Sequence, residues 1–178
     1  PRLSEASSDL GGLSLVNRVI WQGSKNDPNA KSPRGAVGLM QIMEPTAGDP
    51  GFDVTPMNDP DKDRYDPEIN TKFGMQYLEA MLNRYDGDIE LALIAYNAGP
   101  GNADKFKDNR DYSFREFWWR TDDDGNFIRD KDGNKIPGWA QESQPYVEKI
   151  MGVQKSAAIS AMEGLNPLVK QTSLDRGL

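Results

Sequence analysis

The clearest structural signal in this chain is the stretch DPEINTKFGMQYLEAMLNRYDGDIELALIAYNAG, residues 66–99. Asp66 offers an N-cap, and Pro67 suits the first position of a helix because its missing N–H would have no partner there. The pattern predicts a helix from Pro67 to about Tyr85. Apolar side chains recur at four-residue steps along one face of it, at Ile69, Phe73, Tyr77 and Met81.

A second helix start follows at Asp88. The segment ELALIAYNAG continues the helical pattern until Gly99 and Pro100 stop it. Asp86 and Gly87 form the connection, and a connection this short packs two helices against each other as an antiparallel hairpin. The sequence therefore predicts a helical core.

On the N-terminal side, LSLVNRVIWQ at residues 13–22 has apolar residues at three- and four-residue steps, which predicts a short helix ending at Gly23. The polar residues 24–34 favour a loop. The run GAVGLMQIM, residues 35–43, is apolar but broken by two glycines. It suits a short buried strand or a tight turn, and a helical turn is expected near Pro45.

On the C-terminal side, NFIRDKDGNKIP at residues 126–137 places an Asp-Gly turn between two extended runs. This pattern predicts a β-hairpin inserted between helices. A last long helix is expected from about Ser143 to Gly164, with Pro145 in its first turn. Its apolar positions are Val147, Ile150, Met151, Ala158 and Met162. No internal repeat is evident.

The composition limits the chemistry that this chain can perform. Its 178 residues suit a single domain spanning residues 1–178. There is no histidine and no cysteine, which excludes a Ser-His-Asp triad, a Cys-His pair, a disulfide framework and a histidine or thiolate zinc site. Acid-base chemistry must therefore use carboxylates, Tyr or Lys.

Charge and hydropathy limit the partners. The net charge of −7, with no stripe rich in Lys and Arg, gives no attraction to phosphate backbones, so nucleic acid is not an expected partner. No apolar run approaches the roughly 20 residues that span a bilayer. The N-terminus also lacks the basic and apolar segments of a signal peptide. We expect a globular monomer with no membrane span.

Several motifs resemble the successive signatures of the soluble lytic transglycosylase (SLT) family. They are GS at residues 23–24 with Pro28 four residues further on, SPRGAVGLMQ at residues 32–41 and AYNAGPG at residues 95–101. DPEIN at residues 66–70, and Glu142 with Tyr146, resemble the intermediate and C-terminal motifs. The resemblance covers about residues 13–152, and the last helix and tail occupy residues 143–178.

The resemblance implies a mainly α (α+β) lysozyme-like domain, with the β element at residues 35–43, the hairpin near 126–136 and a cleft between them. The family cleaves the β-1,4 bond between N-acetylmuramic acid and N-acetylglucosamine without water and leaves a 1,6-anhydro ring. One carboxyl group suffices, because it protonates the leaving oxygen and then accepts the proton of the C6 hydroxyl that closes on C1. The implied partner is the peptidoglycan glycan strand, with no cofactor and no metal.

The position of the family's catalytic Glu is occupied by Gly23 when the motifs are aligned on Ser24 and Pro28. Glycine cannot transfer a proton, and general acid-base assistance is worth roughly 10²–10⁴-fold, so we expect negligible cleavage. Gly23 also fits the C-cap of the helix that ends there. Glu44 and Glu142 are candidate substitute acids, but each is more typical of a solvated or capping carboxylate near a helix start.

The resemblance also implies seven substrate-binding positions. In the family, the Ser of the first motif lies near the catalytic carboxyl, and the Met-Gln pair lines the cleft, where the Gln amide offers a donor and an acceptor to an N-acetyl group. The Tyr and Asn at the end of the second helix lie beside the carboxyl. The alternative to these roles is a local backbone bond for the Ser and core packing for the Met and the tyrosines. The positions are Ser24, Met40, Gln41, Tyr96, Asn97, Glu142 and Tyr146.

Two further clusters have simpler interpretations. Phe114, Phe117, Trp118 and Trp119 could stack on sugar rings, but core packing is favoured. The Asp-rich residues 122–132 suggest calcium, yet aligning Gly125 with the invariant glycine of an EF-hand loop puts Arg120 at the first ligand position. Ordinary hairpin turns are therefore favoured there.

Three functions remain open on the sequence. The first is a lytic transglycosylase disabled at residue 23, the second is a natural pseudoenzyme that binds peptidoglycan, and the third is a lysozyme-type muramidase of the same fold. All three place the chain at the bacterial cell wall, in the periplasm. Its source would be a phage virion or lysis protein, or an excised domain of a periplasmic enzyme.

Overall fold

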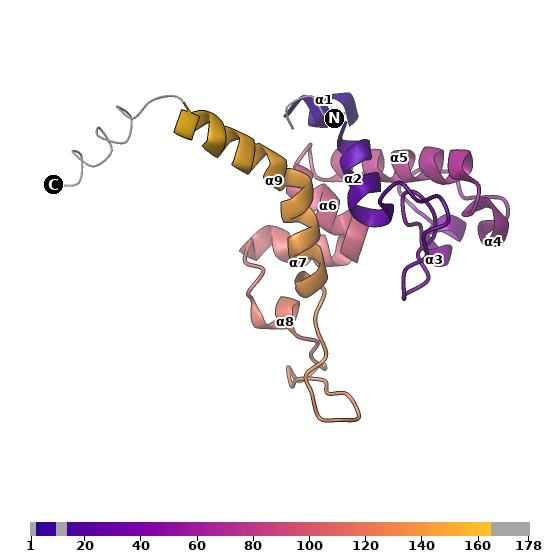
Figure 1. Ribbon diagram of the computed structural model, residues 1–178. Coiled ribbons are helices and arrows are strands. Elements are labelled where there is room, and N and C mark those ends of the chain that lie inside the picture. Colours follow the sequence, from indigo (N-terminus) through magenta and orange to yellow (C-terminus); the bar gives the residue numbers. More distant parts are fainter. Residues whose placement is uncertain (1–2, 10–13, 165–178) are drawn as a thin grey trace.

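The computed structural model describes residues 3–9 and 14–164, without the side chains of residues 7–9 and 153–164. This part of the chain is mainly helical (Figure 1). Its helices are α1 (Leu3–Asp9), α2 (Leu15–Ser24), α3 (Glu44–Gly48), α4 (Pro60–Asp63), α5 (Pro67–Arg84), α6 (Ile89–Ala98), α7 (Pro100–Asn109), α8 (Arg115–Trp118) and α9 (Ala140–Gly164). No helix within the described ranges has the length and apolar character needed to cross a membrane.

The helical hairpin predicted from the sequence is confirmed as α5 and α6. Asp66 caps the start of α5, where its carboxylate accepts two backbone N–H groups at 2.9 and 3.0 Å. Asp88 caps α6 in the same way, at 2.9 Å from the N–H of Leu91. Asp86 and Gly87 between them have φ angles of 53° and 86°. These left-handed residues turn the chain back, so that α6 packs along α5.

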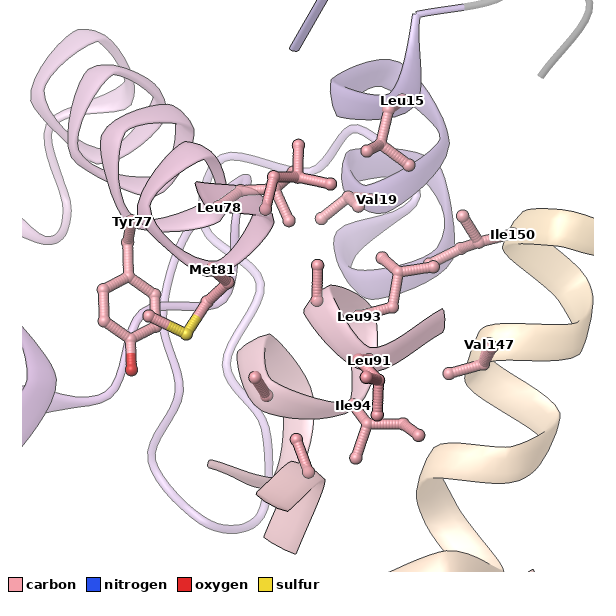
Figure 2. Close-up of a cluster of buried hydrophobic side chains, with 14 of the residues drawn as sticks. Leu15, Val19, Tyr77, Leu78, Met81, Leu91, Leu93, Ile94, Val147 and Ile150 are labelled. Carbon is pink, nitrogen blue, oxygen red and sulfur yellow. The ribbon is translucent and has the colours of Figure 1, made fainter. Parts of the chain in front are cut away.

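Helix α6 forms the centre of the core. It packs against α5, α7 and α9, while α2 packs against α9 as well. Figure 2 shows the side chains that converge there, which are Leu15 and Val19 from α2, Leu78 and Met81 from α5, Leu91, Leu93 and Ile94 from α6, and Val147 and Ile150 from α9. The core therefore holds α2 and α6, which lie far apart in the sequence, against one face of α9.

Helix α2 ends at Ser24, one residue later than predicted, and its C-cap lies two residues beyond Gly23. Lys25, with φ of 56°, is its C-cap, and the Lys25 N–H donates to the Trp21 carbonyl at 3.2 Å. The interpretation of Gly23 as a C-cap is therefore wrong, because the left-handed residue that closes the last turn is Lys25. Leu13, where the helix was expected to begin, lies outside the described residues.

Two further helix boundaries differ from expectation. Gly99 does stop α6, with φ of 92°, but Pro100 then begins α7, since the first helical position needs no N–H. Helix α9 begins at Ala140, ahead of the predicted Ser143, because the Ser143 N–H already bonds the Trp139 carbonyl at 3.0 Å. Pro145 therefore lies inside the helix. The side chains of Ala158 and Met162 lie outside the described part.

The predicted β element at residues 35–43 is a bridged loop. Val37 forms isolated antiparallel bridges with Lys31 and with Ile42. Gly38 turns the chain with φ of 81°, and a Cβ at this position would lie only 2.7 Å from Cγ of Asn70. Of the two alternatives for this run, the tight turn is the correct one.

The predicted hairpin is part of a larger insert between α8 and α9, which extends beyond α8 in Figure 1. The expected pairing appears as a bridge between Arg129 and Lys135. Two more isolated bridges join Thr121 to Phe127 and Trp119 to Pro137. Three extended segments therefore pair around two turns, where the sequence had indicated one turn.

The two turns of this insert have similar sequences and the same pattern of hydrogen bonds. They read DDDGN at residues 122–126 and DKDGN at residues 130–134. In both turns the first carboxylate accepts the backbone N–H groups of the third and fifth residues, at 2.8 to 3.1 Å. These acidic side chains bond their own backbone, which supports the turn interpretation of the segment.

Candidate active site

A hollow of about 530 Å³, called the groove below, opens between α2, the bridged loop, the end of α6 and the start of α9. Seven of the eight positions predicted from the motifs line it: Gly23, Met40, Gln41, Tyr96, Asn97, Glu142 and Tyr146. The remaining lining residues are Val19, Gln22, Ser32, Arg34, Ala36, Met43, Pro145 and Lys149. Packing of α2 and α6 against α9 is what assembles these distant motifs.

Gly23 lies in the last turn of α2, on the edge of the groove. Its φ is not positive, so the backbone here does not require glycine. A Cβ at position 23 would lie 3.2 Å from Cγ of Gln41. A side chain placed there would therefore point at Gln41, which would have to move by only a few tenths of an ångström.

Met40 is held in place by contacts with α5. Its backbone N–H donates to Oδ1 of Asn70 at 2.8 Å, and only 1% of its surface is exposed. Gly74 on α5 makes room for it, since a Cβ at that position would come within 2.7 Å of the Met40 Cβ. Met40 therefore contributes to the core and to the groove at once.

The amide of Gln41 is used by the loop itself. Its Nε2 donates to the carbonyl of Gly38 at 2.9 Å and to that of Ala30 at 3.2 Å. Because both N–H bonds of the amide are then occupied, Gln41 offers a ligand its oxygen and no free donor. The expectation that it presents both a donor and an acceptor is therefore wrong.

Two tyrosines form the inner wall of the groove. The Tyr96 hydroxyl donates to the Met40 carbonyl at 2.8 Å. Burial raises the pKa of Tyr96 well above its usual range, and the nearby Tyr146 and Tyr77 raise it further. Burial also raises the pKa of Tyr146. Both phenols are therefore neutral near pH 7, and neither is a general base there.

Asn97 joins the end of α6 to the start of α9. Its Oδ1 accepts a hydrogen bond of 2.5 Å from the hydroxyl of Ser143, a fully buried residue. This contact orients the Asn97 amide so that its nitrogen remains available as a donor toward the groove. No motif in the sequence marked Ser143, and its role follows only from the packing of α6 on α9.

The two candidate substitute acids occupy different places. Glu142 lies in the groove, with Oε2 3.0 Å from Nη1 of Arg34. Glu44 is not among the lining residues, and its Oε2 lies 3.6 Å from Nη2 of the buried Arg64. Each carboxylate therefore faces a guanidinium group.

Ser24 is the one predicted position that does not line the groove. It is buried in α2, where its hydroxyl donates to the Ile20 carbonyl at 3.0 Å. A contact between Ser24 and substrate stays a prediction. Two cations of the groove, Arg34 and Lys149, were not predicted. Lys149 could have been found from helical spacing, because it follows Glu142 by two turns and so shares its face.

The aromatic cluster divides between core and surface. Phe117 is buried and Trp118 packs against the core. Phe114 is 42% exposed, and Trp119 lies half-buried. None of the four lines the groove. Within the described ranges, no group of three or more Asp, Glu, His or Cys residues is arranged to hold a metal ion.

Comparison with known proteins identifies a family. A sequence profile described as "Transglycosylase SLT domain" matches residues 6–117. The chain is 37% identical over 101 residues to peptidoglycan transglycosylase gp16 of Escherichia phage T7, across 56% of this chain and 8% of that protein. It is also 37% identical over 90 residues to soluble lytic murein transglycosylase of Escherichia coli K12, across 49% of this chain and 14% of that enzyme.

A solved structure shares the fold. An inactive mutant of lytic transglycosylase Slt from Pseudomonas aeruginosa superposes with a TM-score of 0.52 at 25% identity, over 83% of this chain and 22% of that one. The predicted mainly α, lysozyme-like architecture is thereby confirmed. The chain spans less than a quarter of the length of each of these relatives.

Proposed function

Because the chain belongs to the transglycosylase SLT domain family, we propose that its groove binds a glycan strand of peptidoglycan and that the cleavage step is blocked at residue 23. One observation carries this proposal. Four motifs, separated by more than a hundred residues of sequence, converge on a single hollow beside Gly23. This convergence supports a binding site for peptidoglycan, the polymer named in the descriptions of the relatives.

The polar groups of the groove suit a neutral sugar. Asn97 offers an amide donor and Gln41 an amide oxygen, which match the acceptor and donor of an N-acetyl group. Tyr96 and Tyr146 supply largely apolar surface for a pyranose ring. These groups bind and orient, and none of them is an acid of suitable strength at the cleavage point.

The missing group is a carboxyl at residue 23. In the family's reaction, a carboxylic acid protonates the glycosidic oxygen as the bond to C1 breaks. The carboxylate then accepts the proton of the C6 hydroxyl as that oxygen bonds to C1, so the acid is regenerated and no water is consumed. A carboxyl at position 23 would extend from α2 toward Gln41, into the groove.

Neither substitute acid is well placed to take over this step. Glu142 is in the groove, but its carboxylate is paired with Arg34 at 3.0 Å. Glu44 lies outside the groove, beside Arg64. We therefore propose that the chain with Gly23 holds glycan strands at the bacterial cell wall without cutting them.

The test is Gly23→Glu, with Gly23→Gln as the matched control of equal size and no acidic proton. Each protein is incubated with purified sacculi, and soluble muropeptides are measured by liquid chromatography and mass spectrometry. We expect anhydro-muropeptides from Gly23→Glu at a rate at least about 100-fold above the unaltered chain. The Gln variant should remain at the background rate.

Two results would contradict this proposal. Release of muropeptides by the unaltered chain at the rate of Gly23→Glu would show that the acid lies elsewhere. Products heavier by one water, with a reducing end, would assign the restored enzyme to the lysozyme-type muramidases.

Binding without cleavage is the second candidate function. The ordinary helical backbone at Gly23 supports it, because no conformational need explains the glycine. Cosedimentation of the unaltered chain with sacculi measures it directly. Retained binding by the Gly23→Glu variant, without any product, would favour a pseudoenzyme whose groove no longer supports the chemistry.

A further inference from the structure

A second hollow, of about 550 Å³, lies between α7, α8 and the insert that precedes α9. Its lining includes Arg34, Lys105, Glu116, Phe117, Arg120 and Trp139. Arg34 also lines the groove, so the two hollows meet at this side chain. Most of the second hollow is built by residues after the segment that matches the family profile, which ends at residue 117.

The charge of this hollow is opposite to that of the chain. Arg34, Lys105 and Arg120 face a single acid, Glu116, whereas the chain carries a net charge of −7. Arg34 is paired with Glu142. Among the residues that the structure describes, no carboxylate lies within ion-pair distance of Lys105 or Arg120. Two cations are therefore available to an anionic ligand.

The floor of the hollow is apolar and firmly held. Phe117 is buried, and its ring centroid lies 5.2 Å from that of Trp139. A Cβ at Gly138 would lie 2.8 Å from the carbonyl carbon of Phe117, so the end of the insert presses directly on α8. The Arg120 N–H donates to the Ile136 carbonyl at 3.0 Å, which fixes the backbone that carries its guanidinium.

We propose that the second hollow binds the acidic peptide stem of a muramic acid residue whose sugar ring lies in the groove. This inference rests on the proposed function. In peptide-bearing strands the lactyl carboxyl of each muramic acid is amide-linked to its stem, so the sugars themselves have no charge for Lys105 and Arg120 to recognise. The stem carries several carboxylates on short, partly aliphatic residues, and so matches a cationic rim over an apolar floor.

The position of Arg34 supports this assignment. Its side chain is 72% exposed and lines both hollows. A stem attached to a sugar in the groove would pass beside it on the way to Lys105 and Arg120. Arg34 can then bind a carboxylate of the stem and keep its pair with Glu142, because a guanidinium has five N–H donors and the pair uses Nη1.

The experiment compares peptide-bearing glycan strands with the same strands after an amidase has removed the peptides. The amidase leaves one lactyl carboxylate on each muramic acid, attached directly to the sugar, and the strands without peptides are called bare strands. Because the Gly23 form is expected to leave both intact, its affinities for them can be measured by titration calorimetry. We expect tighter binding of the peptide-bearing strands, weakening as salt rises. Lys105→Glu/Arg120→Glu should lower that affinity about tenfold and leave the affinity for bare strands unchanged.

The matched control is Lys107→Glu/Lys131→Glu. These exposed lysines lie on α7 and on the insert, as Lys105 and Arg120 do, but outside the hollow. The control makes the same change in net charge, so both affinities should stay close to those of the unaltered chain. Melting temperatures of all variants identify any loss of folding.

Two outcomes overturn the inference and leave the proposed function standing. They are equal affinity of the unaltered chain for both kinds of strand, and an equal loss of both affinities in Lys105→Glu/Arg120→Glu. A third arm uses wall teichoic acid, and tighter binding of this phosphate polymer through the same two cations would overturn the assignment to peptide. Failure to bind either kind of strand would refute the proposed function itself, and the inference with it.

Discussion

At the scale of single residues, glycines have three different roles beside the groove. Gly23 sits on helical backbone without a positive φ, so its conformation does not require glycine. Two features favour glycine at position 38, which are its φ of 81° and the lack of room for a Cβ beside Asn70. Gly35 has a similar φ of 88°, but nothing lies within 4 Å of the position of a Cβ. Under the proposed function, Gly and Glu at residue 23 would therefore differ in chemistry with little structural consequence.

Gly35 and Gly38 allow conformational strain to be separated from crowding. Gly35→Ala adds only the strain of a left-handed alanine, which we expect to cost about 1–2 kcal/mol of unfolding free energy. Gly38→Ala adds the clash with Asn70 and should cost about 2–4 kcal/mol. Urea denaturation of both variants measures the difference. Equal costs would show that the contact between Gly38 and α5 is looser than the structure has it.

At the scale of elements, one side chain of α5 holds the loop that carries Met40 and Gln41. Asn70 is fully buried, and its Oδ1 accepts the Met40 N–H at 2.8 Å. Its Nδ2 donates to the carbonyls of Val37 at 2.9 Å and Arg64 at 2.8 Å. An amide can satisfy all three groups at once, whereas a carboxylate or an apolar side chain cannot. The shape of the groove therefore depends on a residue outside it.

Asn70→Ala should destabilise the chain by about 3 kcal/mol, because it leaves the Met40 N–H and the Arg64 carbonyl without partners and removes one of the two bonds to the Val37 carbonyl. It should also weaken binding to sacculi, since Met40 and Gln41 lose their anchor. Asn83→Ala is the control, as an exposed asparagine on the same helix, and should change stability by less than about 0.5 kcal/mol. If Asn70→Ala melts like the control, the loop is held by other contacts.

At the scale of the whole molecule, the chain has no histidine, so no imidazole contributes to its pH dependence near neutrality. Its buried tyrosines make the stability of the fold depend on pH in the alkaline range. Burial raises the pKa values of Tyr96, Tyr112 and Tyr146, and the Glu90 carboxylate beside Tyr112 adds to its shift. Tyr96 and Tyr146 line the groove, and Tyr112 bonds Glu90 on α6.

We expect stability to fall as pH rises above 10, the ordinary pKa of tyrosine. Below pH 10 the folded and unfolded chains both keep the phenol protons, so these residues add no pH dependence there. Above pH 10 the unfolded chain releases protons that the folded chain retains, and each such tyrosine then costs about 1.4 kcal/mol of stability per pH unit. Urea denaturation at fixed pH values from 8 to 11.5 measures the slope.

Tyr146→Phe provides the matched variant, because it removes one phenol from the groove wall and keeps the ring. Its stability should decline less steeply above pH 10 than that of the unaltered chain. An unchanged slope would mean that the Tyr146 phenol ionises as readily in the folded chain as in the unfolded one.

Interactions between residues close in the sequence allowed several elements of this protein to be predicted from the sequence alone. The caps at Asp66 and Asp88, the four-residue spacing along α5 and the short connection at Asp86 depend on residues a few positions apart. The site positions were implied by the resemblance to the SLT family's motifs, and seven of eight line the groove. The absence of a carboxyl at residue 23 is likewise a property of the sequence alone.

Other features depend on partners distant in the chain. Asn70 bonds Met40 across 30 residues, and Ser143 bonds Asn97 across 46. The ion pair of Arg34 with Glu142, and the meeting of two hollows at Arg34, require α9 to lie beside the bridged loop. No periodicity or cap encodes such contacts, because side chains acquire these neighbours only when apolar helix faces are buried together.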